Sequence, residues 1–141
     1  MNSLGALCSE ANPSKSYELS DTWDCATPLP PLDLEQLHRR CMGRIELVDR
    51  LLASFEKRFP VELLEIEESL SGRDEPRLQL LVHRLKGAAA NISAPLLHRV
   101  IEQLETAIRA CQWTVAQQHL SRLQSEWERF THYKGSVYAK N

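Results

Sequence analysis

The apolar residues of this chain recur every three or four positions through four long segments, and this spacing restricts its fold more than any other feature. The apolar positions of the first segment are Ile45, Val48, Leu52, Phe55, Phe59, Leu63, Ile66 and Leu70. Similar stripes run through residues 78–92, 97–111 and 113–130. Such a period places apolar side chains on one face of a helix, and no segment shows the alternation typical of a strand. The sequence therefore predicts an all-α protein.

Short polar turns separate the predicted helices. Residues 72–74 form the first turn, in which Asp74 is a suitable N-cap for the next helix. Pro60 lies inside the first stripe, but the apolar phase continues across it, so we expect one bent helix. A short opening helix over residues 32–40 precedes the four long ones. Long helices joined by short connections predict an antiparallel up-down four-helix bundle.

The two ends of the chain differ from this helical body. Residues 1–31 are rich in serine and proline and hold no apolar period for two turns. Such a segment cannot bury enough surface to offset its ordering entropy, so we expect a disordered N-terminal tail. Residues 133–141 are expected to form a second short tail. The bundle domain is therefore predicted to span residues 32–132.

Composition narrows the range of partners. The chain has 141 residues, with 17 Lys and Arg against 19 Asp and Glu and a formal net charge of −2. This balance lacks the positive field on which non-specific nucleic-acid binding depends. No apolar run approaches the roughly 18–20 residues that span a bilayer, and the N-terminus lacks the pattern of a secretory signal. We expect a cytoplasmic monomer that binds neither nucleic acid nor membrane.

Metal sites are not indicated either. The four cysteines form no C-x-x-C pair, so zinc-ribbon and thioredoxin-type spacings are absent from the sequence. Glu35 and His38 form one E-x-x-H pair, but a di-iron bundle needs two such pairs and two further carboxylates. We expect no metal ion and no cofactor.

The helix predicted over residues 78–92 has an unusual outer face. When Leu81 points to the core, His83 lies about 200° and Gly87 about 240° around the helix axis. Lys86 and Ala90 lie on the same outer side. His83 is therefore predicted to point to solvent or to the rim of the neighbouring helix.

The residues around His83 suggest a chemical role for it. Glycine inside a helix costs about 1 kcal/mol relative to alanine, so Gly87 gives up helix stability to leave space one turn after His83. Lys86 carries an ammonium group over the same turn. An exposed neutral imidazole, a vacant notch and a nearby cation suit a nucleophile that receives a dianionic phosphoryl group. His83, Lys86 and Gly87 are the candidate catalytic residues.

The hairpin between this helix and the next one indicates a fourth member of the site. Its turn centres near residues 93–94, so in an antiparallel pair His83 is level with about Leu104. Leu104 faces the core, whereas Glu105 stands on the rim at that height, and Glu102 lies further outside as the second choice. A carboxylate that accepts a hydrogen bond from one imidazole nitrogen leaves the other nitrogen free to attack.

The segment HRLKGAAANISAPLL, which begins at His83, resembles the H-x-L-K-G signature of histidine-containing phosphotransfer (HPt) domains. The similarity covers about residues 32–130 and includes the RCMG stretch at residues 40–43 and a W-x-x-A-x-x-x-L pattern from Trp113. It implies a four-helix bundle with a short N-terminal covering helix. Ser93 departs from the family, in which glycine is common at this turn.

The resemblance also implies a function. His83 would take a phosphoryl group from a receiver-domain aspartate or a kinase and pass it to another receiver. The partners would be response-regulator receiver domains and a sensor (hybrid) histidine kinase. The chain would have no kinase activity of its own, and Mg²⁺ would belong to the receiver. Family members often carry Gln or Glu where Glu105 falls.

Simpler explanations exist for each feature. A surface histidine is usually only solvated, and Gly87 could be a place where another helix packs closely. The alternative function is a binding module that docks on a receiver domain or another signalling protein without being phosphorylated. Either function needs partner contacts beside the histidine, and the candidate contacts are Gln79, Ala90, Ala94, Leu96 and Glu102. Comparable neighbours are also absent from three further histidines: His98, His119 and His132.

Overall fold

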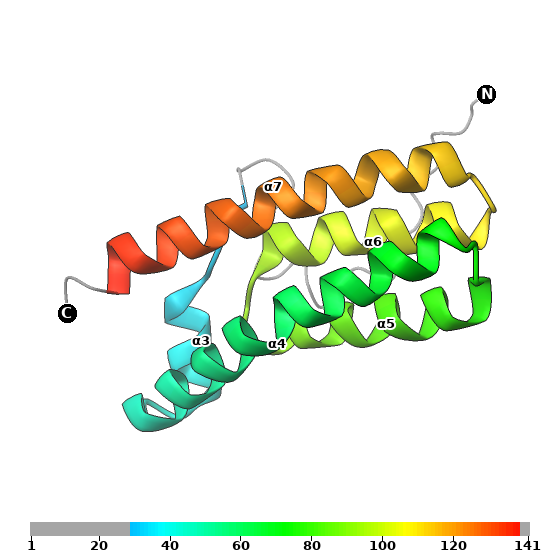
Figure 1. Cartoon of the computed structure of the whole chain (residues 1–141). Helices are drawn as coiled ribbons and strands as arrows, with labels where there is room; N and C mark the ends of the chain where they lie inside the picture. The colour runs from blue at the N-terminus through cyan, green and yellow to red at the C-terminus, as the bar shows by residue number, and fades with distance from the viewer. Residues whose placement is uncertain (1–28, 139–141) are drawn as a thin grey trace, which may run out of the picture.

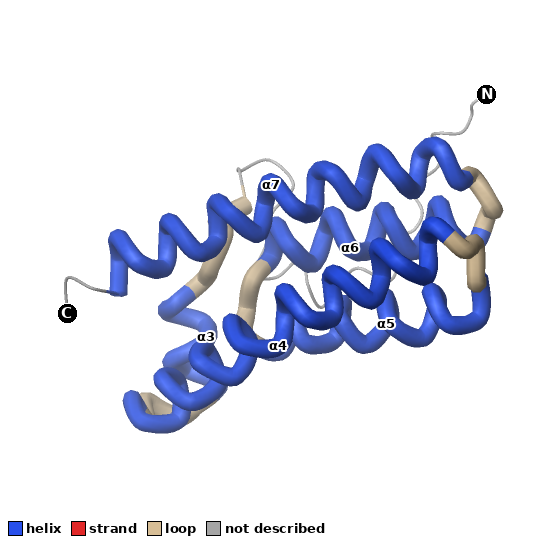
Figure 2. The backbone as a smooth tube through the Cα atoms, in the orientation of Figure 1, coloured by secondary structure: helices blue, strands red, loops and turns tan. Residues whose placement is uncertain are grey.

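The computed structural model describes residues 29–138, which form five helices and no strand (Figures 1 and 2). With the labels of Figure 1, the helices are α3 (Leu34–Arg40), α4 (Ile45–Ser71), α5 (Glu75–Asn91), α6 (Pro95–Arg109) and α7 (Trp113–Tyr138). The prediction of an all-α fold is confirmed. None of the described helices is long and apolar enough to cross a membrane.

The four long helices lie side by side as an up-down bundle (Figure 1). Each packs against the next helix in the chain, and α4 and α7 also contact each other, which closes the bundle. The short helix α3 packs against α4. Three hydrogen bonds connect the α3 region to the end of α5 and the α5–α6 turn. Asp33 N–H donates to the Ser93 carbonyl at 2.8 Å, and Arg40 Nη1 donates to the carbonyls of Ala90 at 2.8 Å and Asn91 at 3.4 Å. The predicted bundle with a covering helix is therefore present.

The predicted apolar stripes supply the core with two exceptions. Ile45 is 53% exposed because it is the first residue of α4, at the end of the helix. Cys111 is exposed because it lies in the turn after α6 rather than on the helix. An aromatic cluster joins α4 to α7, where the rings of Phe59 and Trp127 stack at a centroid distance of 4.1 Å. The long helix α4 continues without interruption through Pro60, as the unbroken phase predicts.

Helices α3 to α6 end in one recurring turn. The residue after each C-cap has a left-handed backbone, with φ of 55° at Met42, 52° at Arg73, 62° at Ser93 and 56° at Cys111. In the α5–α6 turn, Ser93 N–H donates to the Ala90 carbonyl at 3.1 Å, and Ala94 N–H donates to the Ala89 carbonyl at 3.0 Å. Paired bonds of this kind define the Schellman motif, in which glycine is favoured at the left-handed position. The chain thus builds a glycine-type turn with serine.

The bundle domain extends further at its C-terminal end than the sequence predicts. The C-terminal tail predicted from residue 133 is wrong for residues 133–138, because α7 continues to Tyr138. Tyr133 packs against the core, and Lys134 Nζ lies 3.0 Å from Glu56 Oε1 of α4, so contacts with α4 and the core extend the helix. Most of the predicted N-terminal tail, residues 1–28, lies outside the described residues.

Candidate functional site

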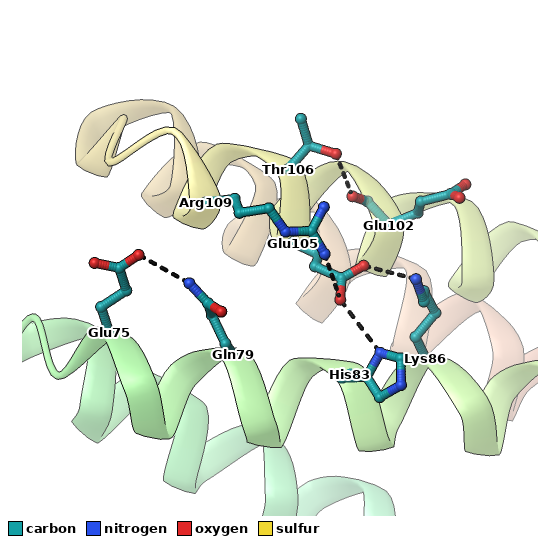
Figure 3. A network of polar contacts seen from close by, with 8 residues as sticks. All are labelled: Glu75, Gln79, His83, Lys86, Glu102, Glu105, Thr106 and Arg109. Atoms are coloured by element: carbon teal, nitrogen blue, oxygen red, sulfur yellow. Dashed lines mark hydrogen bonds and ion pairs between the residues drawn. The ribbon is translucent and has the colours of Figure 1, made fainter. Parts of the chain in front are cut away.

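His83 projects from α5 on the side away from the core, beside α6 (Figure 3). Its side chain is 72% exposed, whereas Leu81 and Leu85 of the same helix are buried. A histidine in this position does not contribute to core packing. Its ring is open to a second molecule, as the helical phase predicts.

Three side chains share the Glu105 carboxylate (Figure 3). Its Oε2 atom lies 3.4 Å from His83 Nδ1 and 3.2 Å from Arg109 Nη2. Its Oε1 atom lies 2.6 Å from Lys86 Nζ. Counting along the hairpin therefore placed Glu105 beside the histidine correctly. The carboxylate is more enclosed than its predicted position on the rim, since only 5% of its side chain is exposed.

The charge of Glu105 is maintained by its neighbours. Burial by itself raises the pKa of Glu105, but the hydrogen bond and positive charge of Lys86 and the charge of Arg109 outweigh it, so the net pKa is lowered. The carboxylate is therefore anionic at neutral pH. An anionic carboxylate can only accept, so Nδ1–H of His83 is the donor in this pair, and in the neutral ring that proton leaves the lone pair on Nε2. This is the tautomer that a nucleophilic Nε2 requires.

Lys86, which the sequence places over the same turn as His83, is directed to the carboxylate of α6. Its ammonium group is paired with Glu105, and the side chain is mostly covered. The short contact reflects a charge-assisted hydrogen bond to a shielded carboxylate. In the absence of a bound partner, the ammonium group of Lys86 therefore pairs with Glu105.

Gly87 leaves open space. A Cβ atom built at this position would meet no atom of another element within 4 Å, and the residue is exposed. The alternative that Gly87 allows another helix to pack closely is therefore wrong for the described part of the chain. The absent side chain creates a notch on the solvent side of α5, one turn after His83.

The candidate partner contacts have different surroundings. Ala94 is 0% exposed because it begins α6 inside the α5–α6 turn, so its prediction as a surface contact is wrong. Ala90 and Leu96 are half-buried. Gln79 is half-buried and donates a hydrogen bond to Glu75 at 2.8 Å, one turn earlier in α5. Glu102 is exposed on α6.

Sequence reasoning missed two residues near the histidine. Arg109 follows Glu105 by four positions, a spacing at which an acidic residue and a following basic residue pair on a helix. That spacing could have identified it. Leu80, three residues before His83, is 58% exposed although it is a large apolar residue. Its helical phase close to His83 was the available signal, because it is the one leucine of α5 outside the predicted stripe.

Within residues 29–138, no group of three or more His, Cys, Asp or Glu side chains is arranged to hold a metal ion. The site is therefore built from an imidazole, a carboxylate, two cations and an open notch.

Comparison with known families identifies this architecture. The family model described as "Hpt domain" matches residues 50–132, from within α4 to within α7, and this span is more than half of the chain. Neither a curated protein sequence nor a solved structure gives a significant match. Hpt domains carry phosphoryl groups in two-component signalling, interact there with receiver domains and kinases, and are not themselves kinases. The matched span contains the exposed histidine and every residue that surrounds it, and we conclude that the chain belongs to the Hpt domain family.

Proposed function

We propose that this protein is a phosphorelay intermediate in which His83 Nε2 accepts a phosphoryl group from a receiver-domain aspartate or a kinase and delivers it to another receiver. The observation that carries the proposal is the exposed ring of His83, held through Nδ1 by an anionic carboxylate and adjoined by the open notch at Gly87.

The proposed transfer balances with the groups on this chain. The Nε2 lone pair attacks phosphorus and an N–P bond forms, while the P–O bond of the donor acyl phosphate breaks and its electron pair leaves on the donor carboxylate. The ring keeps its Nδ1 proton and becomes positively charged. Glu105 stabilises that charge, as an acidic residue stabilises the imidazolium of a catalytic triad. Onward delivery is the reverse reaction with a different receiver.

Lys86 and Arg109 are proposed to hold Glu105 in place rather than to attack the donor. Both contact the carboxylate, and Lys86 is the closer, at 2.6 Å. The proposal assigns no cofactor to this chain, and the Mg²⁺ of the relay belongs to the partner receiver.

Apolar surface beside His83 supports docking of a receiver over α5 and α4. Leu80 lies about 60° from His83 around the axis of α5, on the side of Arg84, which reaches α4. Val61 of α4 is also exposed, and it lines a shallow pocket together with Glu62 and Arg84. Large apolar side chains left in water next to a reactive group are typical of an interaction site. This surface takes the place of Ala94 among the proposed contacts.

The test is transfer of labelled phosphoryl groups. The protein, a His83→Gln variant and a His132→Gln control are incubated with a ³²P-phosphorylated receiver domain, and acid-labile, alkali-stable label on the protein is measured. We expect label on the wild type and on the control, none on His83→Gln, and none on any of them with ATP alone.

Label on a folded His83→Gln variant would refute the assignment of the histidine. A receiver that binds the wild-type protein without transferring label, from any donor, would favour the binding-module function instead.

A further inference from the structure

We propose that the negative charge of Glu105 makes the phosphoryl group on His83 labile, so that this protein releases the group quickly instead of storing it. The inference rests on the proposed function, since it requires His83 to be phosphorylated. Glu105 acts here as a positioning residue, through the ring and through two cations.

The first effect of Glu105 is on the ring. Once Nε2 is bonded to phosphorus, the ring is positively charged as long as Nδ1 keeps its proton. The carboxylate oxygen 3.4 Å from Nδ1 favours that protonated form. Cleavage of the N–P bond from the protonated ring leaves a neutral imidazole, whereas cleavage from the deprotonated ring leaves an anion. The protonated ring is therefore the better leaving group. At pH values where the ring would otherwise lose its Nδ1 proton, Glu105 increases the fraction of the ring in this form.

The second effect is competition for cations. A phosphoryl group carries about −1.5 to −2 charges at neutral pH and is stabilised by lysine or arginine. Lys86 and Arg109 are the cations on the His83–Glu105 network, and both are already paired with the buried carboxylate at 2.6 and 3.2 Å. A neutral residue of the same shape at position 105 would leave both cations for the phosphoryl group. The charge of Glu105 therefore withholds stabilisation from the phosphorylated state.

Other groups near the ring do not duplicate this role. The charged and titratable side chains around it are Arg84 and Lys86 of α5, Glu62 of α4, which pairs with Arg84, and His98, Glu102, Glu105 and Arg109 of α6. Burial lowers the pKa of His98, so it is neutral at neutral pH. Among the carboxylates that the structure describes, Glu105 is the one that pairs with the imidazole.

Release to water provides a direct measure of lability because it needs no partner. A water oxygen bonds to phosphorus, the N–P bond breaks, and its electron pair returns to Nε2. The neutral ring keeps the Nδ1 proton, and the attacking water loses its proton to solvent. The rate of this step reports the leaving ability of the ring without any contribution from receiver docking.

The experiment compares the intact chain with Glu105→Gln and, as a control, Glu128→Gln, which removes one exposed negative charge from α7. Each protein is phosphorylated with phosphoramidate, the donor is removed, and the remaining phosphohistidine is followed by ³¹P NMR. We expect Glu105→Gln to lengthen the half-life about tenfold, which corresponds to about 1.4 kcal/mol of barrier. The control should stay within about twofold of wild type.

The pH profile provides a readout that a merely structural role would not change. Loss of the phosphoryl group slows as pH rises because the ring loses its Nδ1 proton. Without the carboxylate this slowing should begin at lower pH in Glu105→Gln than in the wild type.

Equal half-lives and equal profiles in a folded Glu105→Gln variant would overturn the inference while leaving the proposed function intact. Failure of folded Glu105→Gln to accept phosphate would also overturn it, because Glu105 would then be needed for uptake. Absence of phosphohistidine in the wild type would instead refute the proposed function.

Discussion

The carboxylate of Glu105 pairs with an imidazole, an ammonium and a guanidinium at once, although its side chain is almost fully buried. A buried carboxylate is costly unless its charge is paired and its oxygens accept hydrogen bonds. Here Lys86 and Arg109 provide that compensation, and they are also what lowers the pKa of Glu105. The orientation of His83 thus depends on two residues that act through its carboxylate partner.

Ser93 is a strained residue that has no role in the proposed phosphoryl transfer. Its φ is 62°, and its buried hydroxyl finds no hydrogen-bond partner within the described part of the chain. We expect Ser93→Gly to raise the free energy of unfolding by about 1 kcal/mol, because glycine removes both penalties and keeps the carbonyl that binds Asp33. Urea denaturation measures the change.

The same substitution in a regular helix is its control. Ser121→Gly in the exposed face of α7 should destabilise the protein by about 0.5–1 kcal/mol. A loss of stability in Ser93→Gly as well would show that the left-handed turn is not strained.

Helix α5 combines a buried face with an outer face on which Gly87 leaves open space one turn after His83. Gly87→Leu should leave helicity unchanged, because its side chain enters open space. It should slow transfer from a phosphorylated receiver about tenfold or more, since the leucine fills the notch and displaces the reacting groups. Circular dichroism and label transfer measure the two effects.

Gly135 provides a matched control for this substitution. It is also exposed, lies inside α7, and has open space at its Cβ position. Gly135→Leu should therefore transfer label at the wild-type rate. Equal transfer rates in the two leucine variants would contradict the role of the notch.

At the scale of the whole molecule, stability depends on the contact between α4 and α7. Phe59 is fully buried, stacks on Trp127 at 4.1 Å, and lies 5.3 Å from the ring of Phe55. Phe59→Ala should lower the free energy of unfolding by about 3–5 kcal/mol, because it removes a large side chain and leaves a cavity. Thermal unfolding followed by circular dichroism and tryptophan fluorescence should show one transition shifted to lower temperature.

Val61→Ala, two residues further along α4, is the control at an exposed position and should change stability by less than about 0.5 kcal/mol. A Phe59→Ala variant as stable as this control would mean that the aromatic cluster does not hold the bundle together.

Much of the fold and part of the site were predictable because they depend on local periodicity. The 3.6-residue period of Leu78, Leu81 and Leu85 defines the buried face of α5 and therefore the exposed direction of His83. Counting residues from the turn located Glu105. In two antiparallel helices joined by a short connection, residues at equal distances from the turn lie beside each other. Asp74 caps α5 through its side chain, as its type and position predict.

Other features could not be predicted because they depend on contacts between helices. The phase of Lys86 is visible in the sequence, but its choice of Glu105 as partner requires the distance between α5 and α6. The position of Ala94 in a turn near His83 suggested a surface contact, but the packing of that turn buries it. The extension of α7 past residue 132 depends on Glu56, far away in the sequence.

The spacing of apolar residues was enough to predict the helices found within residues 29–138, the face that each one buries and the histidine that remains outside, because a regular backbone period converts spacing into direction. The charges that meet around that histidine, and the depth at which the carboxylate is enclosed, follow from the packing of α5 against α6. Side-chain pairing and burial depend on the separation of neighbouring helices, and no local pattern encodes that separation.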